Sequence, residues 1–305
     1  MKKIAVTGSN GLLGQKLVYL LKARKDIELH ALARGENRVR EKNGYYFHSV
    51  DLTDKQQVQK TLDEIQPDVI INTAAMTNVD LCETEREQCW QINVKAVEYL
   101  VESAKKTNAH LIHLSTDFVF DGKNGPYKET DEPNPLSYYA ESKLASEKIV
   151  QNSGLEKWAI VRTIIVYGVV DNMSRSNVVL WAKNALENKQ SINVVDDQFR
   201  SPTLAEDLAM GCVLIADKGA SGIYHISGDE IMSILDLVYK VADFYKLDKS
   251  LITPVKSETL NQPAKRPPKT GFILDKAKKE LGYQPHSFVE GLKIVDEQLK
   301  NLQNS

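Results

Sequence analysis

The sequence has little of what disulfide frameworks and metal centres require. It contains three cysteines among 305 residues, Cys82, Cys89 and Cys212, and no two of them form a Cys-x-x-Cys pair. An odd number without paired spacing argues against a disulfide framework and is typical of a reducing compartment. The six histidines show no ligand-like clustering with the cysteines, so no metal site is predicted.

A strong net charge and a long hydrophobic run are also lacking. The formal net charge is −2, the pI is about 6.3, and lysines are scattered among acids, so neither nucleic acid nor a membrane is an expected partner. The apolar run over 159–170 holds Arg162 and is far too short to span a membrane. The first apolar run is broken by Gly8 and is too short for a signal peptide, so a cytoplasmic location is expected.

What the first half does contain is an alternation of apolar strand patterns and amphipathic helix patterns. Apolar strands separated by helices predict a parallel sheet covered on both faces, which is the doubly wound, Rossmann-type α/β fold. The expected strands are 3–7, 28–33, 45–49, 68–73, 110–115 and 158–163, and the expected helices are 12–24, 55–65, 84–107 and 138–151.

The pattern changes after about residue 170. The chain becomes rich in helices, with short strands expected at 192–195 and 223–226 and a Pro/Lys-rich stretch at 262–269. We therefore expect an NAD(P)-binding domain over 1–168 and a smaller, mixed α/β substrate-binding portion over 169–305, from which the chain can re-enter the sheet. Parallel sheets of this type bind ligands at the carboxyl ends of their strands, which the later portion can cover.

A glycine-rich loop joins the first expected strand to the first expected helix. Residues 7–14 read Thr-Gly-Ser-Asn-Gly-Leu-Leu-Gly. Glycines let the backbone turn sharply and approach a pyrophosphate, and the helix N-terminus adds free N–H groups. The position between strand and helix makes this a dinucleotide-binding loop, with four expected cofactor contacts: Gly8, Asn10, Gly11 and Leu12.

The choice of cofactor depends on the residue that ends the second strand. An acidic ribose-binding residue is expected about 20 positions beyond the glycines, but Arg34 stands there, followed by Arg38 and Arg40. A guanidinium binds the oxygens of a 2′-phosphate bidentately. NADP(H) is therefore favoured, while Glu36 leaves NAD(H) open.

A Tyr-x-x-x-Lys pattern lies on the expected helix 138–151. Residues four apart share one helix face, so Tyr139 and Lys143 are neighbours. A nearby ammonium is expected to lower the pKa of the phenol, which then exchanges a proton with a sugar oxygen. Ser115 and Thr116 end the fifth strand at the ligand edge, where a hydroxyl can hold a reacting carbonyl.

These motifs together resemble the dTDP-4-dehydrorhamnose reductase family of extended short-chain dehydrogenases/reductases, over nearly the whole chain. The segments that carry the resemblance are TGSNGLLG at 7–14, Asp51-Leu52, NTAAMTNVDLCE at 72–83, Asn93, STDFVFDG at 115–122, YAESK at 139–143, VRTIIVYG at 161–168, DDQFRSPT at 196–203 and KRPPKT at 265–270.

The resemblance implies roles for individual residues in reducing the C4 carbonyl of a dTDP-4-keto-6-deoxysugar. Thr116, Tyr139 and Lys143 would be the catalytic trio, with Tyr139 as proton donor. The further cofactor-binding residues would be Asp51 and Leu52 at the adenine, Ala74 and Ala75 along the cofactor channel, and Asn93 as support from the next helix. The substrate-binding residues would be Asp117 and Phe118 beside Thr116, and Arg200 and Arg266 for the diphosphate.

Three positions depart from the family pattern. Leu12 replaces a common Gln in the loop, Phe118 replaces a Tyr, and Met76 replaces an aromatic residue near the expected sugar position. The catalytic trio is intact, so the departures concern the identity of the substrate more than the chemistry.

Other functions stay open at this point. A sugar-nucleotide epimerase or dehydratase shares the motifs, although Phe118 stands where a dehydratase would have a second acid. The regulatory subunit of methionine adenosyltransferase resembles the same family and binds NADP and a partner protein, since fold alone does not fix function. Helices on the outer faces could pair in a homodimer.

Overall fold

The centre of the protein is a parallel sheet of seven strands. The structure is a computed structural model that describes residues 1–172 and 176–303. The strand order is β11-β6-β5-β4-β1-β2-β3, and every neighbouring pair is parallel. The bounds are β1 Lys2–Thr7, β2 Ile27–Ala33, β3 Tyr46–Ser49, β4 Val69–Asn72, β5 His110–Thr116, β6 Trp158–Thr163 and β11 Gly222–His225. The strand order reverses at β1 and β4, as in doubly wound sheets, so the predicted fold class is confirmed.

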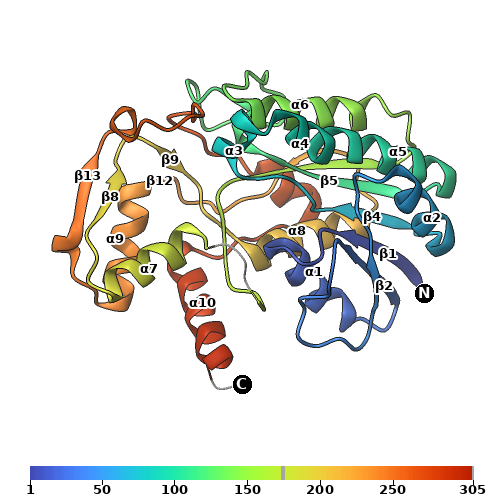
Figure 1. The fold of residues 1–305 in the computed structure, drawn as a ribbon, viewed down its shortest axis with the longest axis horizontal. Helices are drawn as coiled ribbons and strands as arrows, with labels where there is room; N and C mark the ends of the chain where they lie inside the picture. The colour runs from blue at the N-terminus through green and yellow to red at the C-terminus, as the bar shows by residue number, and fades with distance from the viewer. Residues whose placement is uncertain (173–175, 304–305) are drawn as a thin grey trace.

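Helices cover both faces of this sheet, as Figure 1 shows. One face carries α1 (Leu12–Lys22) and α8 (Ala205–Lys218), and the other carries α2 (Lys55–Ile65), α5 (Ala96–Thr107) and α6 (Tyr138–Gln151). The inner strands are apolar because helices bury them on both faces, as at all four residues of β4.

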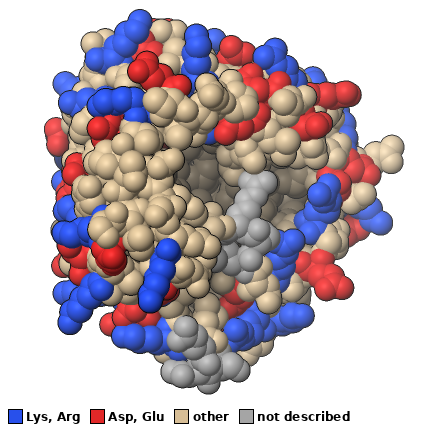
Figure 2. Space-filling view, turned by 60° about the vertical axis from the view of Figure 1, so that its left-hand side comes forward, with Lys and Arg blue, Asp and Glu red and all other residues tan. Residues whose placement is uncertain are grey.

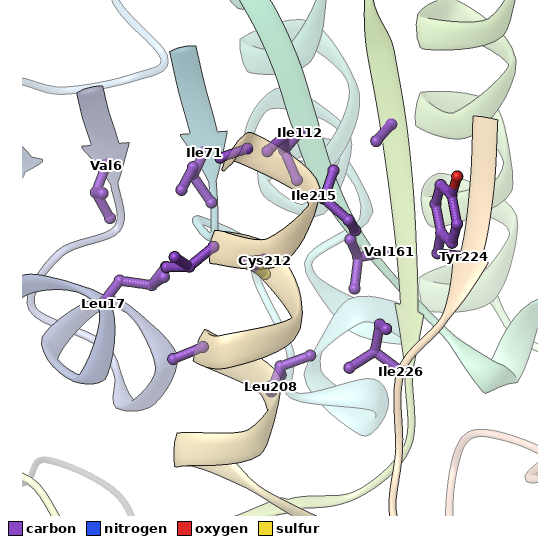
Figure 3. Packing of buried hydrophobic residues seen from close by; sticks show 14 of the residues in the cluster. Val6, Leu17, Ile71, Ile112, Val161, Leu208, Cys212, Ile215, Tyr224 and Ile226 are labelled. Carbon is purple, nitrogen blue, oxygen red and sulfur yellow. The ribbon is translucent and has the colours of Figure 1, made fainter. Parts of the chain in front are cut away.

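The packing of α8 shows how the later part of the chain completes this core. Leu208, Cys212 and Ile215 point from α8 toward Ile112 and Val161 of the sheet (Figure 3). The strand β11 also pairs with β6. Residues beyond 168 therefore contribute one edge strand to the seven-stranded sheet and one helix, α8, to the layer that covers it. The chain therefore returns to the sheet, and the boundary at residue 168 stays a prediction.

The rest of the C-terminal portion has a separate hydrophobic core on the left of Figure 1. Two-stranded pairings β7–β10, β9–β12 and β8–β13 join its segments, the second antiparallel and the others parallel. The bounds are β7 Val166–Tyr167, α7 Val178–Glu187, β8 Ile192–Val195, β9 Phe199–Arg200, β10 Thr203–Leu204, β12 Met232–Ser233, α9 Ile234–Tyr245, β13 Ile252–Val255 and α10 Phe288–Gln303.

One expected helix is divided in the structure. The sequence predicts a helix over 84–107, but the chain forms α3 (Val79–Thr84), α4 (Arg86–Trp90), a π-helical turn (Gln91–Lys95) and then α5. The π-turn holds Asn93, which bonds to a loop outside the helix, and wide turns of this kind occur often at functional sites. No helix within 1–172 and 176–303 is long and apolar enough to cross a membrane.

Candidate active site

A cavity of about 710 Å³ lies between the carboxyl edge of the sheet and the C-terminal portion. The surface in Figure 2 is hollowed near its centre, and mostly uncharged residues border the hollow. The predicted site residues in the cavity wall are Asn10, Gly11, Leu12, Ala75, Thr116, Asp117, Phe118, Tyr139, Lys143, Arg200 and Arg266. The predicted residues outside the wall are Gly8, Arg34, Asp51, Leu52, Ala74 and Asn93.

The glycine loop has the shape that a pyrophosphate needs. Gly8 has a φ of +68°, and a Cβ there would lie 2.8 Å from the Ala74 nitrogen. A Cβ on Gly14 would lie 2.2 Å from the Gly8 carbonyl oxygen. Gly11 is the N-cap of α1 and supplies no side chain to cap the first N–H groups. Backbone N–H groups in such a cradle, at a helix N-terminus, suit an anion.

The end of the site at which the sequence predicts the adenine is open to solvent. The Arg34 side chain is 76% exposed, and its Nη1 lies 3.8 Å from Oδ2 of Asp51. Asn10 ties the loop to this end, since its Nδ2 donates to the Glu36 carbonyl and its Oδ1 accepts from the Arg38 N–H. Arg34 is thus free to turn toward a phosphate at little cost, because an exposed ion pair contributes little.

Tyr139 and Thr116 form the buried end. Thr116 ends β5, Tyr139 lies in the first turn of α6, and both side chains line the same cavity. Burial raises the pKa of Tyr139 above its ordinary value of 10, and the nearby Thr116 hydroxyl only partly opposes this. The expected lowering by Lys143 is therefore wrong in direction, because desolvation of the phenolate outweighs the other influences. The phenol stays protonated at neutral pH.

Lys143 lies one turn further along α6 and is also buried. Burial lowers the pKa of Lys143 from 10.5 to about 8, and the carboxylate of Glu147 only partly opposes this. Its Nζ lies 3.3 Å from Nε2 of His113 in β5. The lysine therefore exchanges its proton more readily than a surface lysine.

Asn93 supports the loop that follows β4. Its Oδ1 accepts from the Met76 N–H at 2.8 Å, and its Nδ2 donates to the Met76 carbonyl and to the Ser142 hydroxyl. Asn93 is fully buried, so it reaches the cavity only through the backbone it holds. This loop includes Ala75 in the cavity wall.

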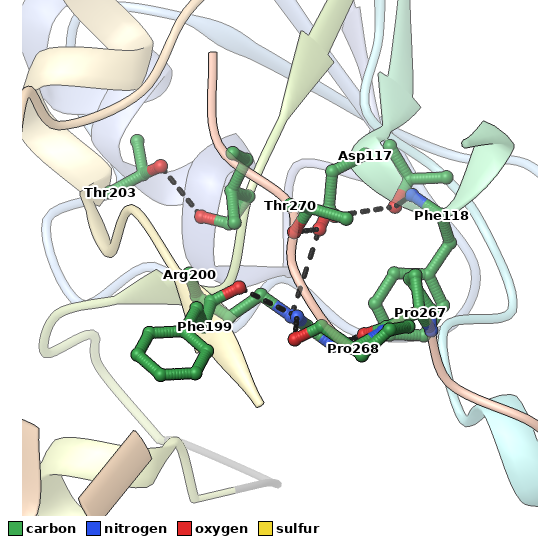
Figure 4. Close-up of polar contacts among 10 residues, drawn as sticks. Asp117, Phe118, Phe199, Arg200, Thr203, Pro267, Pro268 and Thr270 are labelled. Atoms are coloured by element: carbon green, nitrogen blue, oxygen red, sulfur yellow. Dashed lines mark hydrogen bonds and ion pairs between the residues drawn. The ribbon is translucent and has the colours of Figure 1, made fainter. Parts of the chain in front are cut away.

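Arg200 is buried and largely engaged with the protein, as Figure 4 shows. Its guanidinium donates to the carbonyls of Phe199, Pro267 and Pro268, and its Nε lies 3.8 Å from Oδ2 of Asp117. Burial raises the pKa of Asp117, while Arg200 and the Thr270 hydroxyl, which donates to it, oppose the shift. Arg200 thus fixes the segment 267–270 beside Asp117, and its binding of a diphosphate stays a prediction.

Arg266 closes the same wall from the KRPPKT segment. It forms a bidentate pair with Asp80 of α3, with Nη1–Oδ1 and Nη2–Oδ2 distances of 3.1 and 2.7 Å. The Arg266 guanidinium lowers the pKa of Asp80. The pair joins the two portions of the protein across the cavity, and its geometry is the one in which arginine also binds phosphate.

The whole chain matches a known protein family. A model described as the RmlD substrate binding domain matches residues 1–301. The chain belongs to the RmlD substrate-binding domain family. The resemblance inferred from the motifs is thereby confirmed.

Two kinds of known protein are similar to this chain in sequence. A dTDP-4-dehydrorhamnose reductase of Aggregatibacter actinomycetemcomitans is 33% identical over 97% of this chain and 98% of its own length. Methionine adenosyltransferase 2 subunit beta of Bos taurus is 34% identical over 83% of this chain and 75% of its own length. Among solved structures, a dTDP-4-dehydrorhamnose reductase from Clostridium acetobutylicum has a TM-score of 0.85 at 31% identity, covering 98% of this chain and 99% of that chain.

Three side-chain contacts of the candidate site do not follow from the sequence motifs. They are His113 beside Lys143, Asp80 on Arg266, and Thr270 on Asp117. Asp80 and Thr270 are far from their partners in sequence, and no local pattern pairs them. His113 lies in the expected strand 110–115, two positions before Ser115 on the same face of β5, and no motif of the sequence marks it as part of the site. Among the described residues, no group of three or more His, Cys, Asp or Glu side chains could hold a metal ion.

Proposed function

We propose that the protein is an NAD(P)H-dependent reductase of a nucleotide-linked 4-keto-6-deoxysugar. The observation that carries the proposal is one cavity that holds the glycine loop, the Thr116–Tyr139 pair and Lys143. The similarity to a dTDP-4-dehydrorhamnose reductase over nearly the whole of both chains supports the same substrate class.

The residues of the chain fit a dinucleotide along the sheet edge. The cradle of Gly8, Gly11 and Gly14 would hold its pyrophosphate, and Asp51 and Leu52 would flank the adenine. When bound, the nicotinamide would supply the hydride that reduces the C4 carbonyl. NADP(H) is favoured because Arg34 is exposed beside Asp51, and a related Bacillus anthracis dTDP-4-dehydrorhamnose reductase was solved with NADP at 29% identity and a TM-score of 0.83.

Tyr139 is the proton donor in this proposal. Its raised pKa keeps the phenol protonated, so it can give its proton to the C4 oxygen as negative charge develops there. Thr116 lines the same cavity, and its hydroxyl can face the carbonyl oxygen beside the phenol. The resulting phenolate would recover a proton by way of Lys143, whose pKa of about 8 suits exchange near neutrality.

The test follows the absorbance of NADPH with purified protein and dTDP-4-keto-6-deoxysugar made in situ by a dehydratase. NADH replaces NADPH in a parallel run, and Tyr139→Phe is the control protein. Oxidation that depends on the sugar and is lost in the variant supports the proposal. An absence of oxidation while NADPH still binds would contradict it.

A second candidate is a cofactor-binding regulatory subunit. The observation in its favour is the 34% identity to methionine adenosyltransferase 2 subunit beta. Co-purification with a partner enzyme, with no turnover on any sugar nucleotide, would favour this function. A homodimer and a cytoplasmic location remain predictions, and sedimentation of the purified protein tests the first of them.

A further inference from the structure

A buried histidine lies directly behind the amine of Lys143. His113 is fully enclosed in β5, between Asn72 of β4 and the α6 residues Lys143 and Ser146. Its Nδ1 is 3.0 Å from Asn72 Nδ2, and its Nε2 is 2.9 Å from Ser146 Oγ and 3.3 Å from Lys143 Nζ. Each ring nitrogen therefore has a defined partner, and the partners decide where the proton lies.

The orientation of the Asn72 amide is fixed from the other side. Its Oδ1 accepts from the Thr7 hydroxyl at 2.6 Å and from the Ala74 N–H at 3.2 Å. A backbone N–H can only donate, so the oxygen must face Ala74 and the amide nitrogen must face His113. Turning the amide over would set the Ala74 N–H against an NH₂ group, donor against donor.

This orientation selects one state of the imidazole. Because Asn72 Nδ2 can only donate, His113 Nδ1 must accept and carries no proton. Burial and the nearby Lys143 lower the pKa of His113 well below its ordinary value, so the ring is neutral and its single proton is on Nε2. The Nε2–H then donates to Ser146 Oγ, which in turn donates to the Lys143 carbonyl at 2.7 Å.

A protonated Nε2 has no lone pair to offer the ammonium of Lys143. The imidazole therefore offers no acceptor to the ammonium 3.3 Å away, and the N–H groups of Lys143 are left to face the cavity, whose wall includes this side chain. The other charged or titratable groups near the amine are Glu147 of the same helix and Cys89 of α4. Glu147 is held by Arg162 in a bidentate pair, which draws its carboxylate away from the lysine.

We propose that His113 is a positioning residue for Lys143, a neutral imidazole whose tautomer is fixed by Asn72 and which directs the lysine amine into the cavity. Its part in turnover rests on the proposed reductase function, whereas the tautomer and the position of the amine do not. His113 passes no proton itself, because its second nitrogen faces the donor group of Asn72.

The tautomer is tested directly by nitrogen NMR on protein labelled with ¹⁵N-histidine. The His113 signals are identified by their loss in His113→Gln. The expected result is a protonated Nε2 and an unprotonated Nδ1 that do not change between about pH 5 and pH 9, since an unperturbed histidine titrates near 6.5. A proton on Nδ1, or conversion to imidazolium near pH 6.5, would overturn the proposal.

The proposal that His113 directs the Lys143 amine into the cavity is tested with His113→Gln. The oxygen of the glutamine side chain can accept a hydrogen bond from the ammonium, which the imidazole cannot do. The readout is the affinity for NADPH as a function of pH. This affinity is expected to fall as Lys143 loses its proton near pH 8. In His113→Gln this fall is expected to move up by about one pH unit, because an acceptor favours the charged amine. Ser146→Ala, which leaves the imidazole in place, is the matched control and should move it by less.

An unchanged binding profile in folded His113→Gln, or an equal shift in both variants, would contradict the proposal. Turnover is a separate readout. A correct tautomer and a shifted binding profile without reduction of any nucleotide sugar would mean that the proposed function has failed while the positioning of Lys143 stands.

Discussion

The two ends of the candidate site differ in how far water screens their charges. At the end formed by Thr116, Tyr139 and Lys143, the side chains are nearly inaccessible and burial is the largest influence on the pKa of Tyr139 and Lys143. At the end where the adenine is expected, the Arg34 side chain is 76% exposed and its Nη1 lies 3.8 Å from Oδ2 of Asp51. Burying a charge costs free energy and strengthens its interactions with neighbouring charges, whereas the interactions of exposed charges are screened by water and salt.

From this contrast we expect turnover and the choice of cofactor to depend on different ends of the site. The buried end is fixed by a dense hydrogen-bond network, so a change there should alter turnover and stability. The exposed end is loosely held, so a change there should alter the choice of cofactor and little else. Single substitutions at each end can break this division, and the largest effects are expected at the buried end.

The largest effect is expected for Tyr139→Phe. General acid catalysis contributes about 10²–10⁴ in rate, so turnover should fall by at least about 100-fold. Affinity for NADPH should change little, because the ring and its packing remain. Steady-state rates and a binding titration check the two halves, and a turnover close to wild type would contradict the role of Tyr139.

Lys143→Met is expected to stabilise the protein while reducing activity. The folded-state pKa of Lys143, about 8, lies below its ordinary value of 10.5, so the ammonium opposes folding below pH 8 and this penalty disappears as pH rises toward 10.5. Methionine should add about 2 kcal/mol to the free energy of unfolding at pH 7. Denaturant unfolding at pH 7 and pH 9.5 measures it. A gain that does not shrink at the higher pH would show that burial of the charge is not its source.

Arg266 lies where the two portions meet, and its effect should be intermediate. Loss of a charge-assisted bond to a substrate diphosphate should raise the KM for the sugar nucleotide about 10-fold or more in Arg266→Ala, with kcat little changed. Asp80→Ala is the control, since it removes the ion pair and leaves the guanidinium. Equal KM values in the two variants would mean that Arg266 serves Asp80 alone.

The smallest effect is expected at the exposed end. Arg34→Ala should weaken NADPH binding by about 5- to 10-fold, less than a buried charge pair would give, because water screens the contact. NADH binding and the melting temperature should stay at their wild-type values. Titration with both cofactors measures this, and a parallel loss for NADPH and NADH would place Arg34 away from the 2′-phosphate.

The sequence predicted the fold and the composition of the site better than its electrostatics. The strands and most helices follow from periodicity, and the glycine loop and the Tyr-x-x-x-Lys pattern are local in sequence. The direction of the Tyr139 pKa shift was missed, since burial is a property of the packed structure. The pairing of Arg266 with Asp80 and the π-turn at Asn93 were missed for a related reason, because contacts between distant segments decide them.

The division between the two ends is tested most directly by full kinetics of Tyr139→Phe and Arg34→Ala, each with NADPH and NADH and the same 4-keto sugar nucleotide. Tyr139→Phe is expected to lower kcat to the same extent with both cofactors. Arg34→Ala is expected to lower only the preference for NADPH over NADH. An equal fall of kcat with both cofactors in Arg34→Ala, or a change of cofactor preference in Tyr139→Phe, would contradict this division.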